Sequence, residues 1–148
     1  MAVFEVLRHT SLEPDEAWRR ITDWERHGEH IPFTTVALTG TIRDGVGAGF
    51  VARTSIGPVH IDDPMEVTHW DPPVFEKPGR CEIEKRGRVI LGGATITVHR
   101  TSEGSVVRWV EDASVRWGGP FADLPTQLVG PKVFGRVVDQ LLAEPPTR

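Results

Sequence analysis

The chain has 148 residues, of which 39% are hydrophobic and 26% are charged, a composition typical of one ordinary soluble domain with a sizeable core. Its formal net charge is −4 and no basic block occurs along it, which excludes a surface that neutralises nucleic-acid phosphates. No apolar run approaches the ~20 residues that span a bilayer, and the first residues lack a signal-peptide pattern. We therefore expect one cytoplasmic domain over residues 1–148, without stable membrane insertion.

The first 30 residues predict a strand followed by short helices. The segment "AVFEVLRHT" alternates with a period of two, as a β-strand does. Pro14 then fits a first helical turn, and Asp15 and Glu16 favour the positive end of the helix dipole. Apolar residues recur at helical spacing until Gly28 interrupts them. We expect two short helices, or one broken helix, after the first strand.

Between residues 34 and 115 the hydrophobic period changes to two. Clusters of Gly, Pro, Asp and Ser, typical of hairpin turns, separate six strand-like runs. Because short connections between consecutive strands favour antiparallel pairing, these runs predict a long meander. The six runs are 34–42, 47–56, 59–70, 80–86, 88–100 and 105–115.

The last part of the chain predicts a long amphipathic helix. Its apolar residues recur at helical spacing and form one stripe. The helix can extend backward through residues 120–130, in which case Pro131 would kink it. An antiparallel sheet with one apolar face must bury that face against such a helix, and a curled sheet leaves a pocket between them. The stripe consists of Val133, Phe134, Val137, Val138, Leu141 and Leu142.

The order of elements and several motifs resemble the START/polyketide cyclase (SRPBCC, birch-pollen-allergen-like) superfamily, in particular its small actinobacterial-type members. The resemblance covers nearly the whole chain and rests on "AWRRITDWERHGEHIPFT", "GVGAGFVART", "DDPMEVTHWDPP", "CEIEKRGRVILGG" and "VVRWVEDASV". It implies an α+β helix-grip fold, a seven-stranded antiparallel curved sheet wrapped on a long C-terminal helix, with two short helices after strand one. It also implies an apolar cavity. The superfamily shares no catalytic residue set, so the resemblance specifies no activity.

Strand alternation selects the side chains that we expect to line this cavity. The only cysteine, Cys81, shares an apolar face with Ile83 and is interpreted as a small buried hydrophobe, not as a reactive thiol. The expected ligand-binding residues are Val59, Ile61, Met65, Val67, Ile83, Ile96, Val107, Trp109, Phe134 and Val138.

Glu111 is the first candidate for chemistry. Both alternating faces of residues 105–115 are mixed, but the bulky Trp109 favours the face that also carries Glu111. A carboxylate in an apolar cavity has a raised pKa and can act as a general acid or base on an enolisable substrate. The alternative is a Glu111 paired at the sheet surface with Arg53 or Arg108, because inward charges are costly unless paired.

Two polar residues, Asp63 and His69, interrupt the apolar alternation of "VHIDDPMEVTHW". Pro64 has no N–H for a ladder, so we expect a bulge or break there and interpret Asp63 as a turn residue that caps nearby amides. His69 precedes an Asp-Pro-Pro ending, which places it at the rim of the sheet. There it acts either as a proton shuttle at the pocket mouth or as a partner of a loop carbonyl.

Metal and phosphate motifs are absent from the sequence. His27 and His30 flank Gly28, which weakens the helical turn between them. Along residues 60–69, histidines and aspartates two apart in a strand stand ~6.5 Å apart, too far to converge easily on one ion. The glycine-rich residues 45–49 are followed by a strand-like run and not by a helix, as a phosphate-binding loop would be. We expect neither a metal ion nor a cofactor.

The leading hypothesis is binding of a hydrophobic or amphipathic small molecule, such as a lipid, polyketide or aromatic metabolite, between the sheet and the last helix. The alternative is a cofactor-independent polyketide cyclase or dehydratase that moves protons with the catalytic candidates Glu111, His69 and Arg53. A further alternative is a regulatory or toxin–antitoxin-type partner protein, and a homodimer is compatible with each hypothesis. The partner hypothesis expects an exposed apolar interface formed by Trp24, Trp70 or Trp117.

Overall fold

The computed structural model describes residues 2–116 and 119–143, with the backbone alone for residues 2, 115 and 119–129. Its described strands form one seven-stranded sheet in the order β1-β7-β6-β5-β4-β3-β2, and all neighbours in it are antiparallel. From β2 to β7 each strand pairs with the next along the chain, which confirms the meander. The strands are β1 (Ala2–Thr10), β2 (Thr34–Leu38), β3 (Gly49–Ile56), β4 (Val59–Asp71), β5 (Gly79–Lys85), β6 (Ile90–Thr101) and β7 (Gly104–Val115).

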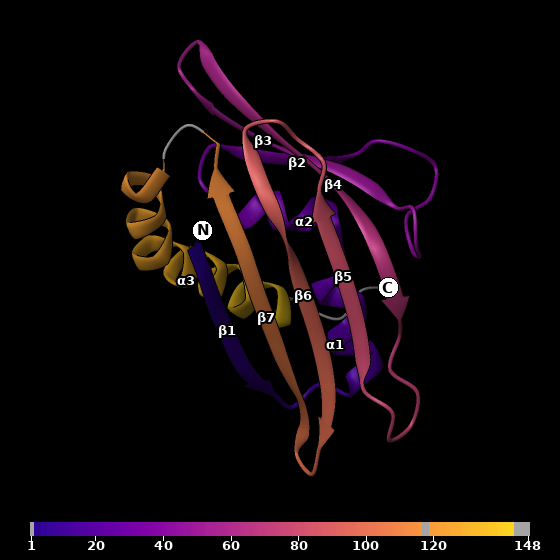
Figure 1. The fold of residues 1–148 in the computed structure, drawn as a ribbon. Helices are drawn as coiled ribbons and strands as arrows, with labels where there is room; N and C mark the ends of the chain where they lie inside the picture. The colour runs from indigo at the N-terminus through magenta and orange to yellow at the C-terminus, as the bar shows by residue number, and fades with distance from the viewer. Residues whose placement is uncertain (1, 117–118, 144–148) are drawn as a thin grey trace.

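The helices all lie on one side of this sheet (Figure 1). Two short helices follow β1, as expected, and a turn of 3-10 helix extends the second. The C-terminal helix starts well before Pro131, so the backward extension is the alternative that the structure shows. No helix among residues 2–116 and 119–143 is long and apolar enough to cross a membrane. The elements are α1 (Pro14–Ile21), α2 (Trp24–His27), η1 (Gly28–His30) and α3 (Gly119–Ala143).

Strand β2 is shorter than the predicted run 34–42, because the chain leaves the sheet after Leu38. The loop that follows contains Gly45 and Gly47 at φ of 124° and 94°, a conformation that favours glycine. Arg43 holds this loop against α2, with its guanidinium 2.9 Å from Asp23 Oδ1 and 2.6 Å from Glu25 Oε1. These two ion pairs therefore connect the loop to the N-terminal end of α2.

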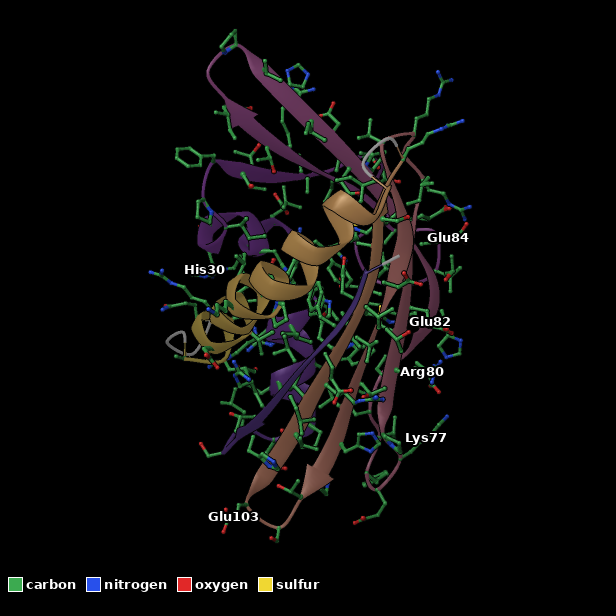
Figure 2. All side chains as sticks on the ribbon, turned by 60° about the vertical axis from the view of Figure 1, so that its left-hand side comes forward. His30, Lys77, Arg80, Glu82, Glu84 and Glu103 are labelled. Carbon is green, nitrogen blue, oxygen red and sulfur yellow. The ribbon has the colours of Figure 1, made fainter. Side chains whose placement is uncertain are left out.

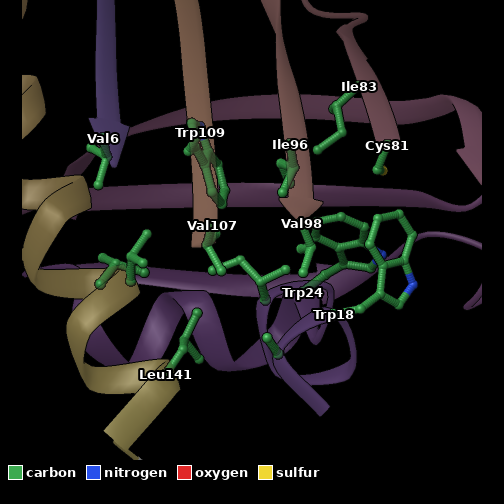
Figure 3. Packing of buried hydrophobic residues seen from close by; sticks show 14 of the residues in the cluster. Val6, Trp18, Trp24, Cys81, Ile83, Ile96, Val98, Val107, Trp109 and Leu141 are labelled. Carbon is green, nitrogen blue, oxygen red and sulfur yellow. The ribbon is translucent and has the colours of Figure 1, made fainter. Parts of the chain in front are cut away.

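The hydrophobic core lies between the inner face of the sheet and the helices (Figure 3). Alternating residues of β5, β6 and β7 point inward, and the apolar stripe of α3 meets them through Val137, Val138 and Leu141, all fully buried. On β5, by contrast, Arg80, Glu82 and Glu84 point away from the helices (Figure 2). Cys81 is fully buried, and burial raises the pKa of its thiol to about 12, so it is protonated and packs as a small hydrophobe.

The alternation of strand β4 does not break at Pro64, as predicted, but three residues later. The strand continues through Pro64, which pairs with Val51 of β3. Its carbonyl accepts a hydrogen bond from Arg86 N at 2.7 Å, so the side that lacks an N–H faces β5 just beyond the end of that strand. The bulge lies instead between Val67 and His69. One extra residue there reverses the faces that follow.

Candidate ligand-binding pocket

A pocket of about 70 Å³ lies between the sheet and the helices, at the α2 end of the core. Aromatic rings form much of its wall, and Trp24 stacks on Phe50 with 4.7 Å between ring centroids. Trp109 lies between the rings of His27 and Phe134, at 5.2 and 5.5 Å. The remaining wall contains three charged side chains, from Asp63, Lys85 and Glu111.

These three side chains form a buried ion cluster, which we call the Lys85 cluster. Lys85 Nζ lies 2.7 Å from Asp63 Oδ2 and 3.2 Å from Glu111 Oε1. Only 5% of the Lys85 side chain, 14% of Asp63 and 6% of Glu111 are exposed. The Trp109 indole N–H donates to Glu111 Oε2 at 2.8 Å. The charges are therefore paired and largely removed from water, an arrangement that is costly unless every partner is in place.

The register of the sheet brings the cluster together from three strands. Met65 of β4 pairs with Lys85 of β5, which places Asp63 two residues along on the same inward face. Strand β6 separates β5 from β7, but its residue at this level is Ala94, which pairs with both Ile83 and Glu111. Because Ala94 is small, no bulky β6 side chain stands between Lys85 and Glu111.

Burial and ion pairing together raise the pKa values of all three groups of the Lys85 cluster. Burial raises the pKa of Glu111 above its ordinary value, although Lys85 and the Trp109 N–H oppose the shift. Burial likewise raises the pKa of Asp63 against the opposing effect of Lys85. Burial lowers the pKa of Lys85, but the attraction of Glu111 and Asp63 is larger in sum, so its pKa lies above the ordinary value. Lys85 is therefore a stable ammonium, and the carboxyls hold protons more readily than in water.

Several residues expected in the pocket are found in its wall. Of the expected catalytic groups, Glu111 lines the pocket on the face that Trp109 indicated. Four of the expected apolar residues also line it, whereas four others lie in the packed core outside the pocket wall. The first set is Met65, Ile83, Trp109 and Phe134, and the second is Val67, Ile96, Val107 and Val138.

The outer half of the β3–β4 hairpin lies outside the pocket, although the sequence predicts that Val59 and Ile61 line the pocket. Val59 and Ile61 are 65% and 45% exposed. The hairpin projects past the part of the sheet that the helices cover (Figure 1), so its inward-facing side chains have nothing to pack against. Strand alternation predicts which face of the sheet these residues occupy, but it does not predict how far the helices extend over that face.

His69 and Arg53 are not placed at the pocket. The bulge after Val67 turns His69 to the outer face, where its side chain is 45% exposed and its Nδ1 lies 3.9 Å from Glu82. Arg53 also lies on the outer face and binds Asp62 through two contacts of 2.6 and 2.9 Å. Of the three expected catalytic residues, only Glu111 therefore lies in the pocket wall.

Two of the tryptophans that were expected to form an exposed interface pack in or against the hydrophobic core. Trp24 is 1% exposed, and Trp70 packs edge-on against Trp18 with 5.1 Å between ring centroids. Trp117 lies outside the described residues. The interface expected from Trp24 and Trp70 is therefore not formed, because both rings pack against the interior of the protein.

The sequence patterns do not single out Lys85 as a pocket residue, and they predict that Asp63 is a turn residue. A signal for Lys85 existed, since it continues the alternating face of Cys81 and Ile83. Pro64 predicts a break in the strand at Asp63, yet β4 continues through that position. The sequence indicates His27 only as a possible metal ligand, whereas its Nε2 hydrogen bonds the Ile21 carbonyl at 2.8 Å and its ring lines the pocket. Among the residues that the structure describes, no group of His, Cys, Asp and Glu is arranged to hold a metal ion.

A wider hollow of about 540 Å³ lies outside the pocket, between η1 and α3. Its wall includes Lys132, Arg136 and Glu29, so it is more polar than the pocket. Ile31 lines both spaces and forms part of the partition between them.

Comparison with solved structures identifies the architecture. Protein TTHA0849 from Thermus thermophilus is 14% identical, with a TM-score of 0.71 over 95% of this chain and 97% of that one. Ara h 8.0201 is 13% identical, with a TM-score of 0.65 over 96% and 98% of the two chains.

The chain has the helix-grip fold, a curved antiparallel sheet wrapped on a long C-terminal helix, in common with these structures. Norcoclaurine synthase from Thalictrum flavum, solved in complex with dopamine and hydroxybenzaldehyde, shares this fold at 14% identity, with a TM-score of 0.65 over 99% of this chain and 88% of that one. A comparison with protein-family models and a search of curated proteins find no match. At these identities the likeness concerns the fold alone, and the chemistry depends on the residues of the pocket.

Proposed function

We propose that this SRPBCC-fold protein binds a small amphipathic molecule, with its polar end at the Lys85 cluster and its apolar body against the aromatic wall. The observation that carries this proposal is the position of the cluster. Three charged side chains line a pocket instead of being enclosed on every side by packed side chains. Convergent polar groups in an apolar pocket are the usual mark of a ligand site.

The size of the pocket restricts the ligand. A space of about 70 Å³ is roughly that of two molecules of liquid water at ~30 Å³ each. Pockets for drug-sized ligands measure ~300–1,000 Å³. Every ligand larger than this therefore requires Ile31 or the α3 side chains to move, and a branched four-carbon molecule requires much less movement than a lipid or a polyketide.

Norcoclaurine synthase supports the proposal as a fold neighbour whose structure contains two small aromatic molecules. An acid–base enzyme is the second candidate function, because the burial that raises the pKa of Asp63 and Glu111 suits proton transfer. Both Glu111 oxygens have a partner in the cluster, since Oε1 forms an ion pair with Lys85 and Oε2 accepts a hydrogen bond from Trp109. Asp63 is therefore the better placed proton donor or acceptor of the two.

The proposal is tested with a panel of branched four-carbon compounds that end in an alcohol, an amide, a carboxylate or an ammonium group. A ligand that binds the folded state raises the thermal midpoint by mass action. We expect at least one compound to do so, and we expect the shift to disappear in Ala52→Leu, which fills the pocket. Ala37→Leu, at an exposed position of β2, is the control that keeps the shift.

Two results of this panel would contradict the proposal. The first is that no compound raises the midpoint of the wild-type protein. The second is that the shifts are the same in Ala52→Leu as in Ala37→Leu, which would place the binding elsewhere. Loss of turnover with retained affinity in Asp63→Asn, on any substrate found by screening, would favour the enzyme.

A further inference from the structure

The Lys85 cluster has one more negative group than positive groups. It contains two carboxyls and one ammonium, and the pocket wall around it is mostly apolar. Of the described residues that line the pocket, His27 of α2 is the remaining titratable one, since β2, β3, β6 and α3 contribute only apolar side chains. An isolated buried negative charge is costly. The cluster therefore needs one further positive charge, supplied either by a proton or by a ligand.

Hydrogen-bond geometry locates where that charge is needed. Lys85 Nζ donates to Asp63 Oδ2 at 2.7 Å and to Met65 Sδ at 3.7 Å, and it forms an ion pair with Glu111 Oε1 at 3.2 Å. Both Glu111 oxygens therefore have a partner, Oε1 in this ion pair and Oε2 as the acceptor of the Trp109 N–H. Asp63 Oδ1 is buried and has no hydrogen-bond partner among the described residues. The polar atom of the cluster that lacks a partner is thus an acceptor, and it matches a ligand that donates.

We propose that the ligand of this pocket is a small organic ammonium ion that donates to Asp63 Oδ1 and packs its apolar body against the aromatic wall. This inference rests on the proposed function, that the pocket binds a small molecule, and adds the chemical class. Ammonium groups are attracted to the faces of aromatic rings, and Trp24, Phe50 and Phe134 provide such rings here. The Trp24 indole N–H, which also lacks a partner among the described residues, favours a body with an additional acceptor.

The ammonium ion and a proton compete for the same oxygen of Asp63. In the empty pocket a proton on Asp63 neutralises the cluster, and the bound ammonium replaces that proton, which leaves for the solvent. Burial raises the pKa of Asp63, in agreement with this exchange. Binding therefore becomes tighter as the pH rises through the pKa of this carboxyl, because fewer protons compete with the ligand.

The experiment compares three probes by isothermal titration calorimetry on the full chain: isobutylammonium, isobutanol and isobutyrate. All three have four carbons and a branched isopropyl end, and they differ in the polar end. We expect the ammonium to bind about tenfold or more tighter than the alcohol, as a charge-assisted hydrogen bond does relative to a neutral one. We expect isobutyrate to bind weakest, and the ammonium affinity to increase as the pH rises through the raised pKa of Asp63.

A matched pair of variants assigns the effect to Asp63. In Asp63→Asn the ammonium should lose its advantage over the alcohol, whereas Asp62→Asn, one residue away on the outer face, should keep it. Should Asp63→Asn fail to fold by circular dichroism, the ranking of the three probes on the wild-type protein decides. An alcohol or carboxylate that binds as tightly as the ammonium, or a pH-independent ammonium affinity, would overturn the inference and leave the proposed function intact. Binding of none of the compounds would overturn both.

Discussion

At the scale of single residues, Lys85 is the group on which the pocket depends. Replacing Lys85 with Met would leave two buried carboxyls without a cation, and we expect the free energy of unfolding to fall by about 3–5 kcal/mol at neutral pH. The loss of Lys85 removes the effect that opposes the raised pKa values of Asp63 and Glu111. The folded variant then binds more protons than the unfolded chain, so its stability rises as the pH falls. Urea denaturation at about pH 7.5 and about pH 5 measures both effects.

Arg53→Met is the matched control for this prediction. It also removes the cation of an ion pair across neighbouring strands, but the pair with Asp62 is exposed to solvent on the outer face. Solvent screens such pairs, so we expect little change in stability at either pH. Equal losses in the two variants, or a Lys85→Met loss that does not depend on pH, would show that the Lys85 cluster is not the charged and buried group described above.

At the scale of elements, the close approach of β6 to β7 sets the geometry of the pocket. Gly92 has a φ of 121°, and an added Cβ would collide with the backbone oxygen of Asp112. We expect Gly92→Ala to destabilise the protein by about 1–3 kcal/mol, the usual cost of a strained backbone position. Because β6 then shifts relative to β7, probe affinity for the pocket should fall too. Chemical denaturation and the probe titration measure the two effects.

Gly40→Ala is the control for the strand prediction, because a Cβ there would meet no atom within 4 Å. We expect it to leave both stability and probe affinity unchanged. If Gly92→Ala behaved in the same way, the β6–β7 approach would be more adaptable than the structure indicates.

At the scale of the whole molecule, α3 closes the core and one side of the pocket. Leu141 is fully buried in the hydrophobic core, whereas its neighbour Gln140 is exposed. We expect Leu141→Ala to lower the free energy of unfolding by about 2–5 kcal/mol, because it leaves a cavity in a packed core. Gln140→Ala should have little effect. Thermal unfolding followed by far-UV and near-UV circular dichroism should show one transition, and separate transitions would mean that α3 unfolds independently of the sheet.

The sequence determined which side chains share a face, because alternation and helical spacing are local properties of the backbone. On that basis the inward residues of β7, the apolar stripe of α3 and the position of Glu111 were predictable, whereas the helix-grip fold was expected from the family resemblance. The same pattern also placed Lys85 on an inward face, although a lysine in that position gives no sign of its partners.

Only the tertiary structure decided which of these residues meet. The bulge after Val67 turned His69 outward, and alternation alone cannot locate an inserted residue. Pro64 kept its place in β4 because β5 ends beside it, which depends on a strand that follows much later in the chain. The Lys85 cluster joins three strands across a small residue of a fourth. Register between strands is a long-range property, and that register created the pocket's chemistry.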